Sequence, residues 1–358
     1  MEKLKFVSLV LILCNALTFV SANKIEKRQG DFVLQVSLDG GSFSLAYAPE
    51  NSRNRTDFFV SHDDYATTYF SLLLDDAVYR LRRDSVSSMR STESDLGAGL
   101  VYRVKDKLNV SMNLSFLPQF SGVEQGLVKI EVELENISSS AVNVGLKGVF
   151  DTLLGENSGI HFVTARYPYV STEETFTEMA LLQWVRSTNG NESIQFLFDG
   201  NGISSPRLVA LANKDVVTAD GWIPNTKAGR TFNSVFSYNN SAVCALWNTM
   251  SLTPATKSSV TFYIALAAKS KVPPSAQFLG KKEGSGTSTD GDEIVYTDED
   301  GVVYTVGDIT DSMLNMRYIN DLLDRIRKLE EDPENIDRNE LLRLNGELDA
   351  ILEKVRRL

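Results

Sequence analysis

Apolar and polar residues alternate along most of the chain between Asp31 and about Ala268, which is typical of strands with one buried face. In the segment Leu127–Leu134, for example, apolar residues occupy every second position and charged residues fill the positions between them. Two apolar runs around Asp39-Gly40-Gly41 predict a β-hairpin, because an Asp-Gly pair suits a tight turn. Further strands are predicted at Tyr69–Leu74, Gly99–Val104, Leu108–Phe116, Leu127–Leu134, Ala141–Phe150, Glu178–Val185, Ser193–Phe198, Val235–Tyr238, Ser241–Trp247 and Ser259–Ala267.

These strands are long and follow one another without a helical period between them. That order favours a large antiparallel β-sandwich over an α/β fold. We therefore expect a mainly β protein with a sandwich domain over residues 23–270. The length of this range exceeds that of a simple sandwich, so the sandwich is expected to be extended.

The pattern changes after residue 270. Residues 271–292 are rich in Gly, Ser, Thr and charge, which predicts a flexible linker. Residues 293–307 contain two short strand-like runs around an Asp-Gly turn and predict a small β-hairpin. Residues 308–358 show apolar residues every three or four positions in two runs separated by Asp332-Pro333, which predicts a C-terminal α-helical hairpin.

The N-terminus has the three parts of a secretory signal. Two lysines precede an apolar run that ends at Val20-Ser21-Ala22, so we expect cleavage after Ala22 and a signal peptide over residues 1–22. An uncleaved anchor, or a lipoprotein modified at Cys14, are the alternatives. The mature chain is expected to be exported to the periplasm or cell surface, with no integral membrane segment.

Charge and cysteine content narrow the range of functions. The formal net charge of −11 disfavours nucleic-acid binding, which needs clustered Lys and Arg. Cys244 is the only cysteine after the signal, so no intramolecular disulfide is expected. Its apolar surroundings indicate a buried core thiol rather than a nucleophile.

No familiar catalytic or metal-binding motif is present, and we expect no cofactor and no metal. The two histidines, His62 and His161, lack a second histidine at ligand spacing. A catalytic pairing of His161 with Asp151 or Glu156 is a minor alternative. Paired carboxylates are common in an acidic chain, so sugar hydrolysis stays open, although we expect a protein without enzymatic activity.

The segment Leu127–Phe162 contains two strands, a Ser-rich turn and then Phe150-Asp151-Thr152-Leu153-Leu154-Gly155-Glu156-Asn157. It resembles exported β-sandwich domains of the galactose-mutarotase supersandwich type, and it is similar to periplasmic proteins of spirochaetes with a C-terminal helical tail. The resemblance implies a fold and an envelope setting and transfers no catalytic residue. If a sugar site exists, residue type points to Asp151, Glu156, Asn157, His161, Trp184 and Trp222.

Two functions follow from these features. The first is a non-catalytic cell-envelope scaffold that binds a protein partner, or associates with itself, through the helical hairpin. The second is a carbohydrate-binding or carbohydrate-active supersandwich domain; a surface antigen or adhesin differs from the first only in location. The residues expected to bind the partner are Met316, Ile319, Leu323, Ile326, Leu344, Leu348, Ile351 and Val355.

Overall fold

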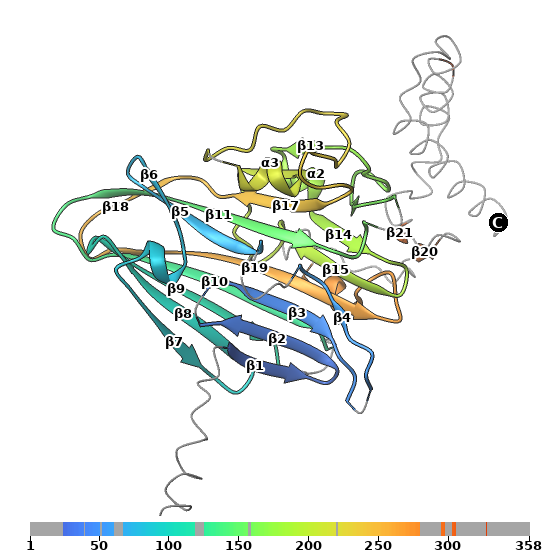
Figure 1. The fold of residues 1–358 in the computed structure, drawn as a ribbon, viewed down its shortest axis with the longest axis horizontal. Coiled ribbons are helices and arrows are strands. Elements are labelled where there is room, and N and C mark those ends of the chain that lie inside the picture. Colours follow the sequence, from blue (N-terminus) through green and yellow to red (C-terminus); the bar gives the residue numbers. More distant parts are fainter. Residues whose placement is uncertain are drawn as a thin grey trace, which may run out of the picture.

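Three antiparallel sheets make up the body of the protein (Figure 1). The computed structural model describes residues 24–38, 40–50, 52–60, 67–118, 125–156, 159–219, 221–279, 295–297, 303–305 and 327. The expected signal peptide and helical hairpin lie outside this part of the chain. Within the described residues, no helix is long and apolar enough to cross a membrane.

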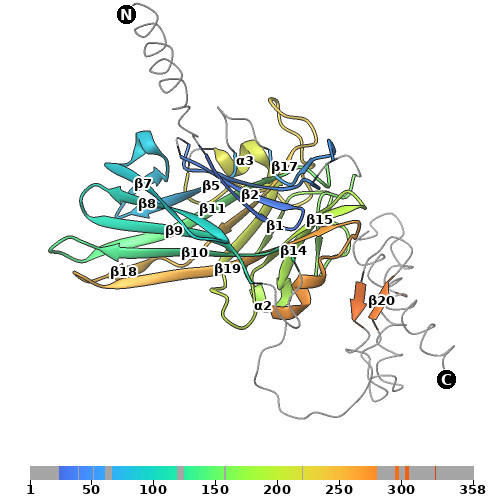
Figure 2. The same ribbon diagram turned by 90° about the horizontal axis from the view of Figure 1, so that it is seen from below.

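The largest sheet has eight strands in the order β12-β14-β15-β19-β10-β9-β8-β7. Figure 2 shows its long central strands β9, β10 and β19 side by side. The strands are β7 (Ser88–Glu93), β8 (Gly97–Val104), β9 (Leu108–Phe116), β10 (Leu127–Asn136), β12 (Val163–Thr164), β14 (Trp184–Thr188), β15 (Glu192–Leu197) and β19 (Lys257–Ala268).

A seven-stranded sheet has the order β13-β16-β17-β11-β5-β6, with β18 also paired to β11. A four-stranded sheet has the order β1-β2-β3-β4. Their strands are β1 (Lys24–Gln29), β2 (Phe32–Ser37), β3 (Phe43–Tyr47), β4 (Thr56–Asp57), β5 (Tyr69–Leu74), β6 (Ala77–Arg80), β11 (Val142–Thr152), β13 (Glu174–Phe176), β16 (Leu208–Asn213), β17 (Ser241–Leu246) and β18 (Met250–Leu252). Short helices complete the body: η1 (Arg83–Ser85), α2 (Met179–Leu182), α3 (Lys214–Thr218) and η2 (Pro274–Leu279).

The alternating pattern of the sequence places one face of these strands in a common core. In β10, Val128, Ile130, Val132 and Leu134 are fully buried, while the charged residues between them are partly exposed. One apolar cluster contains side chains from all three sheets. The mainly β, sandwich-like architecture expected from the sequence is therefore present.

Phe150 of β11 lies at the centre of this core. Its ring centroid is 5.0 Å from that of Phe196 and 5.7 Å from that of Phe262, both in the eight-stranded sheet. It is also 5.8 Å from that of Phe70 in β5 and 6.4 Å from that of Phe43 in β3. Phe150 thus joins all three sheets through ring contacts of the kind that favour tilted and edge-to-face packing.

Two predicted strands are wrong. Glu178–Val185 contains α2, and Gln183 adopts a positive φ of 53° before β14 begins at Trp184. Val235–Tyr238 forms a turn whose apolar side chains face solvent, so its apolar composition does not reflect burial. The sequence pattern also missed β1, β6, β7, β12, β13, β16 and several other short strands; β1 and β7 are rich in polar residues, and the others are short or buried on both faces.

The range predicted as a linker begins within the folded body. Residues Pro274–Leu279 form η2, which contacts β19, and Ala276 is buried against Leu127 and Leu197. In the range of the predicted small hairpin, β20 (Val295–Thr297) pairs antiparallel with β21 (Val303–Thr305).

Replacing Phe150 with alanine should destabilise the whole body, because the cavity would open where three sheets meet. We expect the free energy of unfolding, measured by urea denaturation, to fall by about 3–5 kcal/mol. Val78 of β6 is 50% exposed, and its replacement by threonine should change stability by less than about 0.5 kcal/mol. Equal effects of the two substitutions would contradict the central role of Phe150.

Candidate functional site

A group of polar side chains gathers where β11 ends and β17 begins. Asp151 pairs with Ala242, and Ser241 pairs with both Thr152 of β11 and Asn213 of β16. Because side chains alternate along a strand, Phe150 enters the core and Asp151 faces the other side of the sheet. That side carries a second apolar cluster, which includes Val217 of α3, and α3 itself lies against β16 and β17 (Figure 1).

Asp151 is fully buried, and its carboxylate oxygens have no hydrogen-bond partner among the described residues. Its backbone is held firmly, since its N–H donates to the Thr68 hydroxyl at 3.1 Å and its C=O accepts from the Val60 N–H at 3.0 Å. Burial raises the pKa of the Asp151 carboxyl to about 6. The nearby Thr67 hydroxyl opposes this rise, although it does not meet the geometry of a hydrogen bond.

Glu156 follows five residues later and is only partly buried. Its Oε1 accepts a hydrogen bond from the Ser241 N–H at 3.2 Å. Burial and the negative charge of Asp151 together raise the pKa of this carboxyl to about 7, against the opposing effects of the Ser241 N–H and Lys214. The two carboxyl groups are therefore coupled, and both change protonation close to neutral pH.

A closed ring of hydrogen bonds connects Glu156 to His161. The Asn239 amide donates to the backbone carbonyl oxygen of Glu156, and its own side-chain oxygen accepts from His161 Nε2 at 3.0 Å. His161 Nδ1 lies 2.7 Å from the Ser241 hydroxyl. Burial lowers the pKa of His161, so the ring is neutral, with Nε2 donating to Asn239 and Nδ1 accepting from Ser241.

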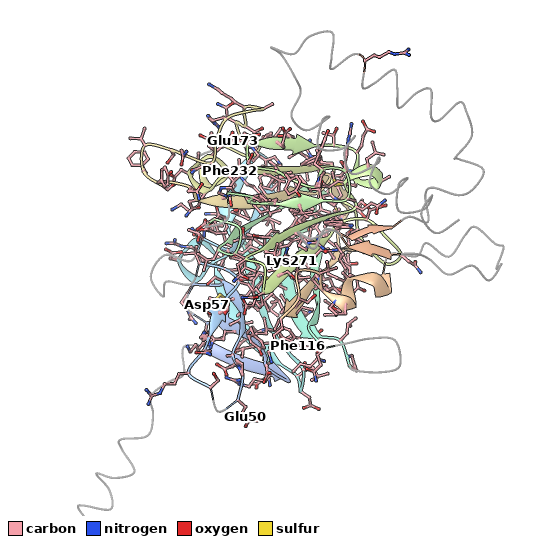
Figure 3. The ribbon with its side chains drawn as sticks, turned by 90° about the vertical axis from the view of Figure 1, so that its right-hand side faces the viewer. Glu50, Asp57, Phe116, Glu173, Phe232 and Lys271 are labelled. Carbon is pink, nitrogen blue, oxygen red and sulfur yellow. The ribbon has the colours of Figure 1, made fainter. Side chains whose placement is uncertain are left out.

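Both ring nitrogens of His161 are thus engaged in hydrogen bonds. Its imidazole also packs on Phe232, with ring centroids 4.3 Å apart. Figure 3 shows Phe232 close to Glu173 at one end of the molecule and Glu50 at the opposite end. The site therefore lies toward the end of the body where the segment 221–240 joins α3 to β17.

A second set of hydrogen bonds holds this joining segment beside the carboxyl pair. The buried Asn213 amide donates to the C=O groups of Phe232 and Asn240 at 2.9 and 3.1 Å. Asp215 accepts hydrogen bonds from the hydroxyls of Ser234 and Ser237. Burial alone would raise the pKa of Asp215, but these bonds and Lys214 outweigh it and keep the pKa below its usual value.

The structure brings together three of the six residues suggested for a sugar site, namely Asp151, Glu156 and His161. Asn157 lies outside the described residues. Among the described residues, neither tryptophan takes part in the hydrogen bonds around Glu156 and His161. Trp184 packs on the eight-stranded sheet with Arg186 above its ring. Trp222 packs beside Gly145 of β11, on the same apolar cluster as Val149 and Ala242.

The sequence did not indicate Asn213, Lys214, Asp215, Asn239 or Ser241 as parts of the site. Asn213 and Asp215 carry a helix-capping signal, since the Asn213 side chain accepts from the Asp215 N–H. That signal follows β16, a buried strand that the alternation pattern does not reveal. Asn239 follows Val235–Tyr238, which was interpreted as a strand, so the turn was concealed. Ser241 begins the predicted strand Ser241–Trp247, where nothing in the sequence indicated a site.

The sequence also made predictions about Cys244, metal binding and partner binding. Cys244 is fully buried, and burial raises the pKa of its thiol to about 12, which confirms a core thiol. In the part of the chain that the structure describes, no group of three His, Cys, Asp or Glu side chains is arranged to hold a metal. All eight residues predicted to bind a partner lie outside that part, so the scaffold hypothesis rests on the sequence alone.

Comparison with known proteins gives a resemblance in fold. No protein-family model and no curated protein matches the chain. Among solved structures, it is similar to a galactose mutarotase-like protein from Lactobacillus casei, with 9% identity, a TM-score of 0.43, and 68% of this chain and 100% of the other covered. A putative aldose 1-epimerase from Escherichia coli K12 shows 9% identity, a TM-score of 0.43, and coverage of 68% and 99%.

An aldose epimerase homologue from C. elegans aligns with 9% identity and a TM-score of 0.43, over 68% of this chain and 98% of the other. The resemblance to galactose mutarotase-like proteins expected from Leu127–Phe162 is thus found among solved structures. At this identity it concerns the arrangement of strands, and no residue role passes from these proteins to this one.

The buried Asp151 carboxyl should make stability depend on pH. Its pKa is about 6 in the folded protein, against about 3.9 in an unfolded chain. Its neutral form is therefore favoured by folding, and the associated stability is present below about pH 4 and lost as the pH rises through about 6. The loss amounts to roughly 2–3 kcal/mol at about pH 8.

Replacing Asp151 with asparagine removes this titration. We expect the free energy of unfolding in urea, taken as variant minus wild type, to be about 2–3 kcal/mol higher at pH 8 than at pH 4. Asp215→Asn provides a control of opposite sign, because the pKa of Asp215 is lowered in the folded protein. If the variant-minus-wild-type difference for Asp151→Asn is the same at both pH values, burial does not perturb the pKa of the Asp151 carboxyl.

Proposed function

We propose that this protein binds a saccharide at the Asp151–Glu156 carboxyl pair and that Glu156 can exchange a proton with it. The observation that carries the proposal is the fully buried Asp151 carboxyl, which has no hydrogen-bond partner among the described residues and acts through its charge on the partly exposed Glu156. Their pKa values are raised to about 6 and about 7. Groups with pKa values near neutrality both accept and donate protons readily at physiological pH. Perturbed and coupled carboxyl groups are concentrated at functional sites.

The two carboxyl groups have different roles in this proposal. Glu156 is partly exposed and would contact the saccharide, because a carboxylate accepts hydrogen bonds from adjacent hydroxyl groups. Asp151 is fully buried and would act through its charge, which raises the pKa of Glu156. The Ser241–His161–Asn239 ring would keep Glu156 in place.

The substrate class follows from the site chemistry together with the sequence resemblance. The hydrogen-bond partners around Glu156 are the amide of Asn239 and the backbone N–H of Ser241, with the opposite charges of Lys214 and Asp215 close by. Such a polar setting suits a ligand with many hydroxyl groups. The segment that supplies both carboxyl groups, Leu127–Phe162, is the one that resembles galactose mutarotase-like domains. If the protein is exported as its N-terminus indicates, envelope glycans in the periplasm or at the cell surface are the saccharides within its reach.

The test begins with calorimetry of the full-length protein against maltohexaose, cellohexaose, chitohexaose and D-galactose. We expect at least one of them to bind, with an affinity that rises as the pH increases through about 7, because the ionised Glu156 forms stronger hydrogen bonds. Glu156→Gln keeps the acceptor for the Ser241 N–H but cannot ionise. Its affinity should therefore be independent of pH.

Asp151→Asn serves as a matched variant in this experiment. It removes the charge that raises the pKa of Glu156, so the midpoint of the affinity profile should move to lower pH while binding persists. Absence of binding to every saccharide at millimolar concentration would refute the proposed function. A pH profile that Glu156→Gln leaves unchanged would remove Glu156 from the site.

A further inference from the structure

Three large apolar side chains project into solvent from the segment that carries Asn239, a hydrogen-bond partner of Glu156. Val235, Phe236 and Tyr238, here called the apolar tip, are 95%, 89% and 86% exposed. They belong to the segment 221–240, of which Asn239 forms part of the ring around His161. All three lie within four consecutive positions of one turn, and exposed apolar side chains that are clustered indicate a binding surface more strongly than scattered ones do.

The backbone under the apolar tip is held in place by hydrogen bonds. The Ser234 hydroxyl accepts from the N–H groups of Phe236 and Ser237 at 3.0 and 2.9 Å, and the Ser234 N–H donates to the Ser237 C=O at 2.8 Å. Both serine hydroxyls donate to Asp215. The tip is therefore an organised turn, and the polar groups face inward while the apolar side chains face outward.

The base of the segment is anchored as well. Glu173 is fully buried and accepts hydrogen bonds from the Arg230 guanidinium at 2.6 Å and the Lys227 N–H at 3.0 Å. The Asn239 N–H donates to the Asn233 side chain at 2.7 Å. The buried Glu173 carboxylate and the side chains of Asn233 and Asn239 thus hold the apolar tip in a fixed position. A turn that is already fixed loses less conformational entropy on binding.

We infer that Phe236 and Tyr238 form an aromatic platform on which a sugar ring of the bound saccharide stacks. This inference rests on the proposed function and adds to it the residues that hold the apolar face of the sugar. A pyranose ring carries C–H groups on one face and hydroxyls at its rim. An aromatic ring suits the first, and the neighbouring Glu156 carboxyl suits the second.

The composition of the turn favours a saccharide over a membrane surface. The residues between Thr231 and Ser241 include no lysine or arginine, and those beside the apolar tip are asparagine and serine. Loops that bind anionic membranes combine apolar side chains with basic residues. The formal net charge of −11 also opposes approach to such a surface.

The test compares Phe236→Ala, Tyr238→Ala and Tyr238→Phe with the wild type in calorimetric titrations of the full-length protein with maltohexaose, cellohexaose and chitohexaose. Each alanine variant should bind the hexasaccharide at least about tenfold more weakly, because an aromatic contact in a binding site is a dominant contributor. Tyr238→Phe retains the ring and should bind within about twofold of the wild type. Leu181→Ala, at a position 48% exposed on α2, is the control and should leave affinity unchanged.

The outcomes separate the platform from the proposed function. If the wild type binds a hexasaccharide and both alanine variants bind it equally well, the platform is wrong and the carboxyl site stands. If the wild type binds neither these hexasaccharides nor D-galactose, both fall. Binding of the wild type to phosphatidylcholine–phosphatidylglycerol vesicles that is lost in Phe236→Ala would then assign the apolar tip to a membrane. Unfolding temperatures verify that each variant is folded.

Discussion

The burial of Phe150 among the aromatic rings of three sheets is the interaction on which the site depends. Its neighbours Phe43, Phe70, Phe196 and Phe262 come from segments far apart in the sequence, so their contact fixes how the sheets meet. Successive side chains of a strand point to opposite faces. Once Phe150 occupies the core, the next residue, Asp151, must face the side of the sheet that α3 covers.

This constraint places a carboxyl group in a buried position and so perturbs its pKa. A carboxylate without a partner is costly to bury, and the protein lessens the cost by keeping the Asp151 proton to a higher pH. Its charge, once formed, acts on Glu156 and raises the pKa of that carboxyl too. A strand position fixed by packing therefore sets the protonation of a group that solvent can reach, and stability is lower near neutral pH as a result.

The sequence predicted the parts of this arrangement that follow from strand alternation. The bounds of β9 agree with Leu108–Phe116, because this strand has one buried face. The bounds of β5 agree with Tyr69–Leu74 as well, although β5 is buried on both faces. The alternation pattern did not reveal β16, which is buried throughout most of its length. It also predicted a strand at Val235–Tyr238, where the apolar residues face solvent. Asp151, Glu156 and His161 were suggested by residue type, whereas Asn213 and Asp215 gain their role only from pairing between distant strands.

The same reasoning explains why the aromatic residues of the proposed sugar site could not be located from the sequence. The tryptophans looked suitable because of their size, yet Trp184 and Trp222 pack against apolar clusters of the body. Phe236 and Tyr238 looked like strand residues, yet Asn213 and Asp215 hold their turn so that both rings remain in solvent. Whether an aromatic ring is exposed therefore depends on the fold. Here the hydrogen bonds of Asn213 and Asp215 hold the turn so that Phe236 and Tyr238 stay in solvent, on the segment that also contacts Glu156 through Asn239.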